Sequence, residues 1–160
     1  MQPFPHFYWV QATATVEGDV PVRVPGLTPI RTATPKEFDG PGNHWSPEHL
    51  LVAAVLDCFV LTFRGVAKVS KLNWISLSCD AAGRLERVDD RAQFTGFALC
   101  VTVRVPGATS EELARRVIKK ADETCLVANS LKAPVRLEIE IETEEAVDTD
   151  TSARTLVANN

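Results

Sequence analysis

The sequence predicts an α+β domain in which antiparallel sheets surround one long, buried central helix. Residues 50–63 are apolar or small at nearly every position, so a helix here lacks a polar face and must be surrounded by protein. Residues 93–105 and 135–141 alternate apolar and polar side chains, the period of a sheet with one buried face. The predicted order is strands, helix, strands, helix, strand, which is typical of an α+β fold.

Length and composition fit a single soluble domain. The chain has 160 residues, of which 45% are hydrophobic and 24% charged. We expect residues 1–144 to form the domain and the acidic tail, residues 145–160, to be flexible. The net charge of -4 and the lack of a Lys/Arg cluster argue against a nucleic-acid partner.

The chain is expected to be cytoplasmic. Its first ten residues carry no Lys or Arg and no sustained apolar run, so they do not resemble a signal peptide. The apolar run of residues 50–63 is interrupted by Asp57 and is shorter than the roughly 20 residues that a bilayer requires. We therefore expect no membrane partner and interpret this run as a core helix.

Local signals place the first half of the elements. Residues 7–31 are rich in Val and Thr between turn residues, which predicts short strands in a meander. Residues 34–45 contain Pro and Gly and are predicted to be a loop. Ser46, Pro47 and Glu48 supply an N-cap, a first-turn proline and a first-turn acid, so the helix should begin here and run to about Lys71.

Strands and a second helix are predicted to follow. The runs 74–81, 83–88 and 93–105 read as strands joined in antiparallel hairpins, with turn signals at Gly83 and at Asp89-Asp90. A helix with Thr109 as its cap and Glu112 completing a capping box should follow, ended or redirected by Asn129-Ser130. Its apolar stripe predicts that one side faces the core: Leu113, Ala114, Val117, Ile118, Ala121 and Cys125.

The chain has four cysteines, which we interpret as thiols because no signal peptide is recognised. Cys79 shares a strand face with apolar neighbours and is interpreted as a small core residue, and Cys100 should lie on the less apolar face of its strand. Neither is assigned a chemical role. Cys58 lies in the middle of the central helix, and Cys125 lies at the end of the second.

Two motifs around these last cysteines resemble a known family. Residues 46–59 (SPEHLLVAAVLDCF) are similar to the Asn/Ser-Pro-Glu-x-Leu-(x)7-Cys-Phe signature of the osmotically inducible protein C and organic hydroperoxide resistance (OsmC/Ohr) family. Residues 120–131 (KADETCLVANSL) resemble its second-cysteine element, and residues 34–40 (TPKEFDG) its preceding loop. The resemblance covers roughly residues 12–141.

The resemblance implies an OsmC-like fold that forms an intertwined homodimer, with active sites at the subunit interface. It also implies a thiol peroxidase. Cys58 would attack an organic hydroperoxide and become a sulfenic acid, and Cys125 would resolve it to a disulfide. A thiol reductant of the dihydrolipoyl type would then restore both thiols. No metal or organic cofactor is expected.

In the family that the chain resembles, an arginine faces the reactive cysteine and is held by the acid of the Pro-Glu motif, which is Glu48 here. This chain departs from the family, because it has no arginine at the expected positions. In the Ohr branch that arginine closely follows a strand like residues 12–15, but residues 12–18 read ATATVEG here and contain no arginine. In the OsmC branch the arginine precedes a Phe-x-Gly element, and in this chain Glu37 stands at that place. Arg23 and Arg31 are the nearby substitutes. Glu48 also has a purely structural interpretation, because an acid stabilises a helix N-terminus. Ten residues separate it from Cys58, a rise of about 15 Å on one helix.

Two other functions remain open alongside the peroxidase. The first is that of a family member that binds a hydrophobic small molecule without efficient turnover. The second is that of a thiol-dependent redox sensor or hydrolase. A metal site formed by His6, His44 or His49 with a cysteine is disfavoured, because no Cys-x-x-Cys or His-x-x-x-His spacing occurs. His44 and Trp45 are predicted to lie on a surface loop or at a pocket entrance.

Overall fold

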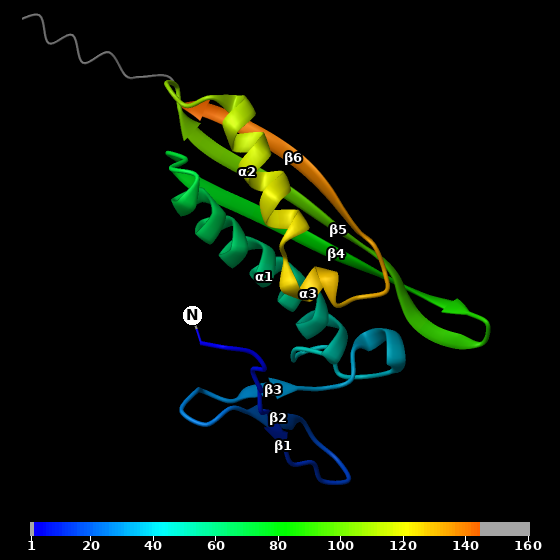
Figure 1. Cartoon of the computed structure of the whole chain (residues 1–160). Helices are drawn as coiled ribbons and strands as arrows, with labels where there is room; N and C mark the ends of the chain where they lie inside the picture. The colour runs from blue at the N-terminus through cyan, green and yellow to red at the C-terminus, as the bar shows by residue number, and fades with distance from the viewer. Residues whose placement is uncertain (1, 145–160) are drawn as a thin grey trace, which may run out of the picture.

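The computed structural model describes residues 2–144 and contains two three-stranded sheets and three α-helices. The predicted flexible tail, residues 145–160, lies outside the described residues. Figure 1 labels the elements in chain order. They are β1 (Gln11–Ala12), β2 (Val20–Arg23), β3 (Ile30–Thr32), the 3-10 helix η1 (Lys36–Phe38), α1 (Pro47–Val69), β4 (Ser76–Val88), β5 (Arg91–Pro106), α2 (Glu111–Glu123), α3 (Leu126–Asn129) and β6 (Val135–Glu144).

The α+β class is confirmed, but the larger sheet is mixed. β4 and β5 form an antiparallel hairpin, closed as predicted by Asp89 and Asp90, which both have positive φ. β6 instead pairs parallel to β5, so the expectation of wholly antiparallel sheets is wrong for this strand. The cause is the α2–α3 connection, because a helical crossover returns the chain to the end of the sheet from which β5 started.

β4 is one continuous strand, so the predicted turn at Gly83 is wrong. Gly83 pairs with Phe97 inside the hairpin, next to a register shift between Arg84 and Leu85. A Cβ atom at Gly83 would lie 2.7 Å from both Val52 Cγ2 and Phe94 Cε1. The glycine therefore serves close packing of α1 on the sheet rather than a turn.

α1 begins as predicted and ends at Val69, two residues before the expected end. Ser46 is its N-cap and accepts a hydrogen bond from the backbone N–H of His49. One stripe is buried against the rest of the fold: Val55, Phe59, Phe63 and Ala67.

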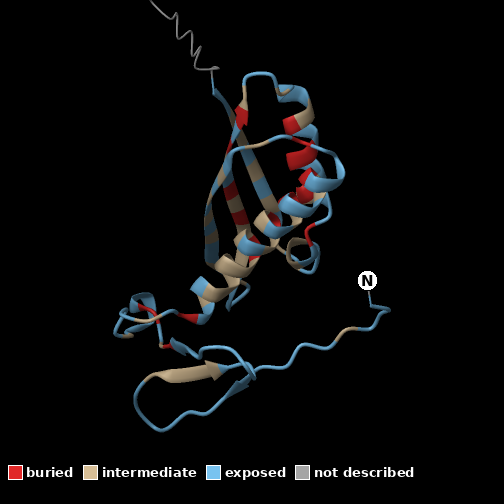
Figure 2. Ribbon diagram, turned by 90° about the vertical axis from the view of Figure 1, so that its left-hand side faces the viewer, coloured by how far each residue is buried: buried red, intermediate tan, exposed pale blue. Residues whose placement is uncertain are grey.

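A single chain does not bury α1 completely. Most of the helix outside this stripe is half-buried or exposed, and Leu61 is 54% exposed in the middle of the helix. By length and composition alone α1 is apolar enough to span a membrane. The sheet, α2 and α3 contact one side of it, and residues on the other side are half-buried or exposed (Figure 2), among them the apolar Leu61 and Val69.

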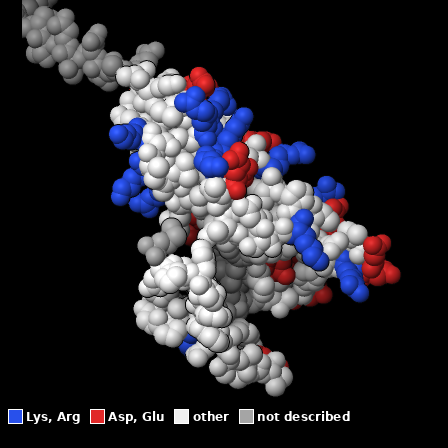
Figure 3. Space-filling view, in the orientation of Figure 1, with Lys and Arg blue, Asp and Glu red and all other residues white. Residues whose placement is uncertain are grey.

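α2 begins one residue later than predicted, because Ser110 rather than Thr109 caps it and accepts from the N–H of Leu113 at 3.3 Å. Its predicted apolar stripe is confirmed by the buried Ala114, Val117, Ile118 and Ala121, whereas Cys125 is buried but lies beyond the end of α2. The outer face of α2 carries charged pairs such as Arg115–Glu111 and Arg116–Glu112 (Figure 3). The helix ends at Glu123, and α3 starts after Cys125. Asn129-Ser130 then ends the helical segment, as predicted.

The predicted N-terminal meander is confirmed as an antiparallel sheet of β1, β2 and β3. This sheet lies to one side of the helices and the larger sheet rather than on top of them (Figures 1 and 2). It is joined to the start of α1 by a bridge between Thr32 and Trp45 and by the N–H of Ala33, which donates to the Trp45 carbonyl at 2.9 Å. Several large apolar side chains in this region are exposed: Phe7, Tyr8, Trp9, Val16 and Leu27.

The close packing at Gly83 predicts an unequal response of two glycines in the same hairpin. Gly83→Ala should lower the free energy of unfolding by about 1–3 kcal/mol, because its methyl group must displace Val52 or Phe94. Gly96→Ala is the matched control, since the nearest atom to its Cβ is 3.9 Å away. Urea unfolding of both variants measures the difference, and equal stabilities would contradict the packing role.

Candidate active site

Cys58 and Cys125 come together where α1 passes α3. Cys58 is half-buried on α1, and Cys125 is 1% exposed at the N-cap of α3. The backbone N–H of Val127, in the first turn of α3, donates to Cys58 Sγ at 3.4 Å. The predicted core-side position of Cys125 is therefore confirmed, and both sulfurs lie beside the first turn of α3.

The two sulfurs experience different surroundings. Burial raises the pKa of Cys125 to about 11; the N–H groups of Ala128 and Val127 oppose this rise, and the neighbouring Cys58 thiol adds to it. Cys125 is therefore almost entirely protonated at neutral pH. Cys58 accepts an N–H bond, a contact that stabilises negative charge on sulfur. The pair therefore combines one sulfur that accepts a backbone N–H, Cys58, with one that is held as a buried thiol, Cys125.

Glu48 does not join the cysteines. It lies in the first turn of α1, where it lines a cavity of about 510 Å³. The other walls are mainly apolar and come from α1, the β4–β5 hairpin and the loop before α1; they include Val52, Leu56 and Phe94. Oε2 of Glu48 is buried and has no hydrogen-bond partner among the residues that the structure describes. Leaving such an oxygen unpaired costs about 1–3 kcal/mol.

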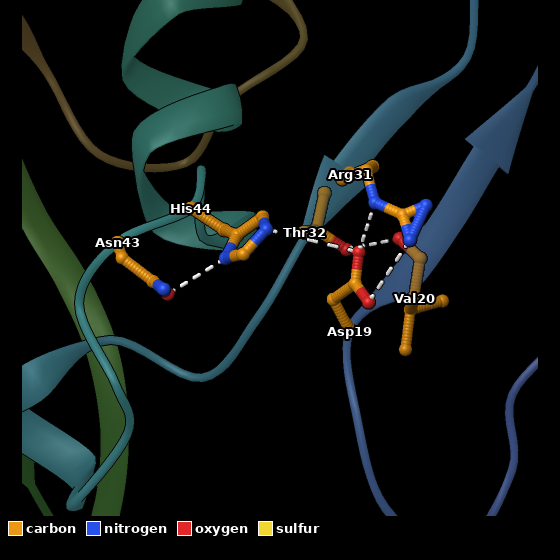
Figure 4. Close-up of polar contacts among 6 residues, drawn as sticks. All are labelled: Asp19, Val20, Arg31, Thr32, Asn43 and His44. Carbon is orange, nitrogen blue, oxygen red and sulfur yellow. Dashed lines mark hydrogen bonds and ion pairs between the residues drawn. The ribbon is translucent and has the colours of Figure 1, made fainter.

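Arg23 and Arg31, the nearby substitutes for the family's arginine, lie in the N-terminal sheet. Arg31 Nε pairs with Asp19 Oδ2 at 2.5 Å, and His44 Nε2 lies 3.7 Å from the same oxygen (Figure 4). Arg23 is exposed at the end of β2. Within residues 2–144, neither arginine is hydrogen-bonded or ion-paired to Cys58 or Glu48.

The histidines are dispersed. His6 contacts the carbonyl of Gln2, His44 faces Asp19 and Asn43, and His49 bonds through Nδ1 to Ser46 Oγ at 2.9 Å. Among the described residues no group of three or more His, Cys, Asp or Glu side chains is placed to hold a metal ion. Trp45 lines the cavity, as the pocket-entrance interpretation predicted, whereas His44 does not.

The other two cysteines lie apart from this site. Cys79 packs against the core, and burial, with Asp80 adding to it, raises its pKa to about 11. Cys100 lies on the exposed face of β5, where its thiol donates to Glu138 Oε2 at 3.7 Å. Both positions confirm the predicted faces of their strands.

The raised pKa of Cys125 predicts slow alkylation. At pH 8 only about one Cys125 in a thousand is a thiolate, so iodoacetamide should modify it at least about a hundredfold more slowly than an ordinary thiol. The rate should rise about tenfold per pH unit up to pH 11 while circular dichroism shows the fold intact. Peptide mass spectrometry measures each site, and guanidinium-unfolded protein, in which the four thiols should react alike, is the control. A midpoint near pH 9 would contradict the assignment.

Comparison with known proteins identifies the fold. Residues 40–140 match the family model described as OsmC-like protein. The chain is 24% identical over 138 residues to the uncharacterized protein YmaD of Bacillus subtilis, covering 84% of this chain and 92% of that protein.

Solved structures agree. An OsmC-like protein of unknown function from Vibrio cholerae superposes with a TM-score of 0.76 at 20% identity, over 84% of this chain and 99% of that one. An organic hydroperoxide resistance protein OsmC from Legionella pneumophila superposes with a TM-score of 0.68 at 25% identity, over 86% and 97%. The family model spans well over half of the chain, and the chain therefore belongs to the OsmC-like family.

Proposed function

We propose that this protein is a thiol-dependent peroxidase that reduces organic hydroperoxides. The observation that carries the proposal is the convergence of Cys58 and Cys125, with the N–H of Val127 on the Cys58 sulfur. Family membership supports it, since one structural relative is described as an organic hydroperoxide resistance protein.

The proposed reaction has three steps. The Cys58 thiolate attacks the terminal peroxide oxygen, the O–O bond breaks, and the alkoxide leaves and takes up a proton as an alcohol. The Cys58 sulfenic acid then condenses with the Cys125 thiol, releasing water and forming a disulfide. An external dithiol of the dihydrolipoyl type exchanges with that disulfide, becomes oxidised itself and restores both thiols. We place this reaction in the cytoplasm, where thiol reductants keep cysteines reduced.

We further propose that the active form is a homodimer. The uncovered side of α1, with Leu61 54% exposed, and the exposed aromatic side chains of residues 7–9 are apolar surfaces of the kind that mark contacts between proteins. The N-terminal sheet extends away from the helices (Figure 2), so it is free to pack on a second copy. A two-fold partner would cover both surfaces at once.

A second candidate function is binding of a hydrophobic small molecule without turnover. The cavity of about 510 Å³ favours it, because pockets of this size hold drug-sized ligands. The absence of the family's arginine from its expected positions favours this function as well, since no described arginine hydrogen-bonds to Cys58 to stabilise its thiolate.

The peroxidase proposal predicts a defined thiol count. One equivalent of cumene hydroperoxide should consume two thiols and yield a Cys58–Cys125 disulfide, measured by thiol titration and peptide mass mapping. Cys58→Ser should abolish the reaction, and Cys125→Ser should leave a Cys58 sulfenic acid that dimedone traps. Cys100→Ser is the matched control and should behave as wild type, because its thiol lies on the exposed face of β5, away from the core side on which Cys58 and Cys125 lie. A folded protein whose Cys58 stays reduced in excess peroxide rules the proposal out.

The dimer proposal predicts the mass of two chains in sedimentation equilibrium at micromolar concentration. Leu61→Glu should shift the protein toward the monomer, because it places a charge in the apolar interface. Val69→Glu is the control: Val69 is 83% exposed, but lies at the last residue of α1. A monomeric wild type, or equal effects of the two substitutions, would contradict this interface.

A further inference from the structure

Asn129 bonds to the chain on both sides of the break that holds Cys125. It is the last residue of α3, and its Nδ2 donates to the carbonyl of Glu123, the last residue of α2, at 3.0 Å. Its backbone N–H donates to the Cys125 carbonyl, also at 3.0 Å. One residue therefore closes the segment 123–129, which contains the buried Cys125.

The Glu123 carbonyl is open to a side-chain donor because it belongs to the last turn of α2. The last four carbonyls of a helix have no N–H partner inside that helix. α3 has only four residues, too few for a stable isolated helix, so contacts outside it must hold it in place. Within residues 2–144, the Asn129 amide makes the one side-chain hydrogen bond that joins α3 to α2.

A second bond joins α3 to α1, but its strength depends on the state of Cys58. It is the bond from the Val127 N–H to Cys58 Sγ. A neutral sulfenic sulfur is a weaker acceptor than a thiolate, because charge-assisted hydrogen bonds are the strong ones. The Asn129 amide bonds to a carbonyl and to neither sulfur, so oxidation of Cys58 leaves its bond in place. Cys125 must react in that oxidised state.

We propose that Asn129 is a positioning residue for the resolving step, and that its amide holds Cys125 within reach of oxidised Cys58. This inference rests on the proposed peroxidase function. In the resolving step the Cys125 sulfur bonds to the Cys58 sulfur, the S–O bond breaks, and the hydroxide leaves as water with the Cys125 proton. Asn129 exchanges no proton or electron. It limits the positions that Cys125 can take, which favours the encounter of the two sulfurs.

The first test uses the full-length protein in a glutathione redox buffer and needs no peroxide. Glutathione disulfide oxidises the Cys58 and Cys125 thiols to a disulfide and becomes two glutathione thiols, and the equilibrium constant measures how well the fold holds the two sulfurs together. Peptide mass mapping quantifies the disulfide. Asn129→Ala and Asn129→Asp should each lower the constant about threefold to tenfold, the range for loss of one hydrogen bond. Asn129→Asp keeps the shape and removes the donor.

Ser130→Ala is the matched control for this equilibrium. It removes a hydrogen bond between neighbouring turns of the same short segment, from Ser130 Oγ to the Leu126 carbonyl at 2.8 Å, and this bond does not cross Cys125. The constant should therefore stay at the wild-type value. Asn129 and Ser130 are both exposed, so substitutions at either position should leave the protein folded.

The second test separates positioning from stability. With cumene hydroperoxide and dimedone present together, Asn129→Ala should trap a larger fraction of Cys58 as the dimedone adduct than wild type, because the sulfenic acid waits longer for Cys125. Urea unfolding of Asn129→Ala and Ser130→Ala should give similar midpoints. A merely structural role would lower the midpoint of Asn129→Ala alone and leave the trapped fraction of folded protein at the wild-type value.

The results separate this inference from the peroxidase proposal. A wild-type Cys58 that stays reduced in peroxide rules out the peroxidase, while the glutathione equilibrium still decides whether Asn129 positions Cys125. A constant that is unchanged in both Asn129 variants, or that falls equally in Ser130→Ala, would overturn the inference. A wild type that forms no Cys58–Cys125 disulfide in the glutathione buffer would overturn it as well.

Discussion

The packing of α1 on the β4–β5 hairpin determines where Cys58 and Glu48 lie. Val55, Phe59, Phe63 and Ala67 recur every four residues and are fully buried, so they fix the rotation of the helix about its axis. Once that rotation is set, Cys58 is directed toward α3 and Glu48 toward the cavity over the hairpin. Gly83 permits the close approach on which this packing depends.

The break between α2 and α3 brings the second sulfur into place. Cys125 has an extended backbone, with φ -67 and ψ 111, so it ends one helical segment and starts the next. The first N–H groups of a helix have no partner inside it. Here Val127 donates to Cys58, and the N–H groups of Val127 and Ala128 lie beside Cys125. A continuous helix through residue 125 would have used these donors for its own backbone.

Features set by local sequence could be predicted, and features set by distant contacts could not. The helix start at Ser46, the stripe of α2 and the Asp89-Asp90 turn depend on neighbouring residues, and the structure confirms them. Gly83 carries the same local signal as a turn, but Val52, far away in sequence, decides its role. The parallel β6 and the half-buried α1 likewise depend on how whole elements pack.

The same distinction applies within the candidate site. The two cysteines and Glu48 could be singled out from motifs, because each sits in a short recognisable segment. The N–H of Val127 has no side-chain signature. The cavity walls come from segments far apart in the sequence, so residues such as Leu85 and Phe94 give no sign of a shared pocket. Sequence reasoning could therefore find reactive groups but not the surroundings that set their chemistry.

The separation of Glu48 from Cys58 has a chemical consequence. A carboxylate beside a thiolate would oppose its ionisation, because like charges raise a thiol pKa. Within one chain, ten residues of helix keep the two groups about 15 Å apart, so Glu48 does not contact the sulfur of its own chain. Both groups nevertheless lie on α1, and Val52 and Leu56 join the cavity to the same packed helix face. Within one chain, the packing of α1 on the hairpin therefore links the cavity walls to the helix that carries the thiol.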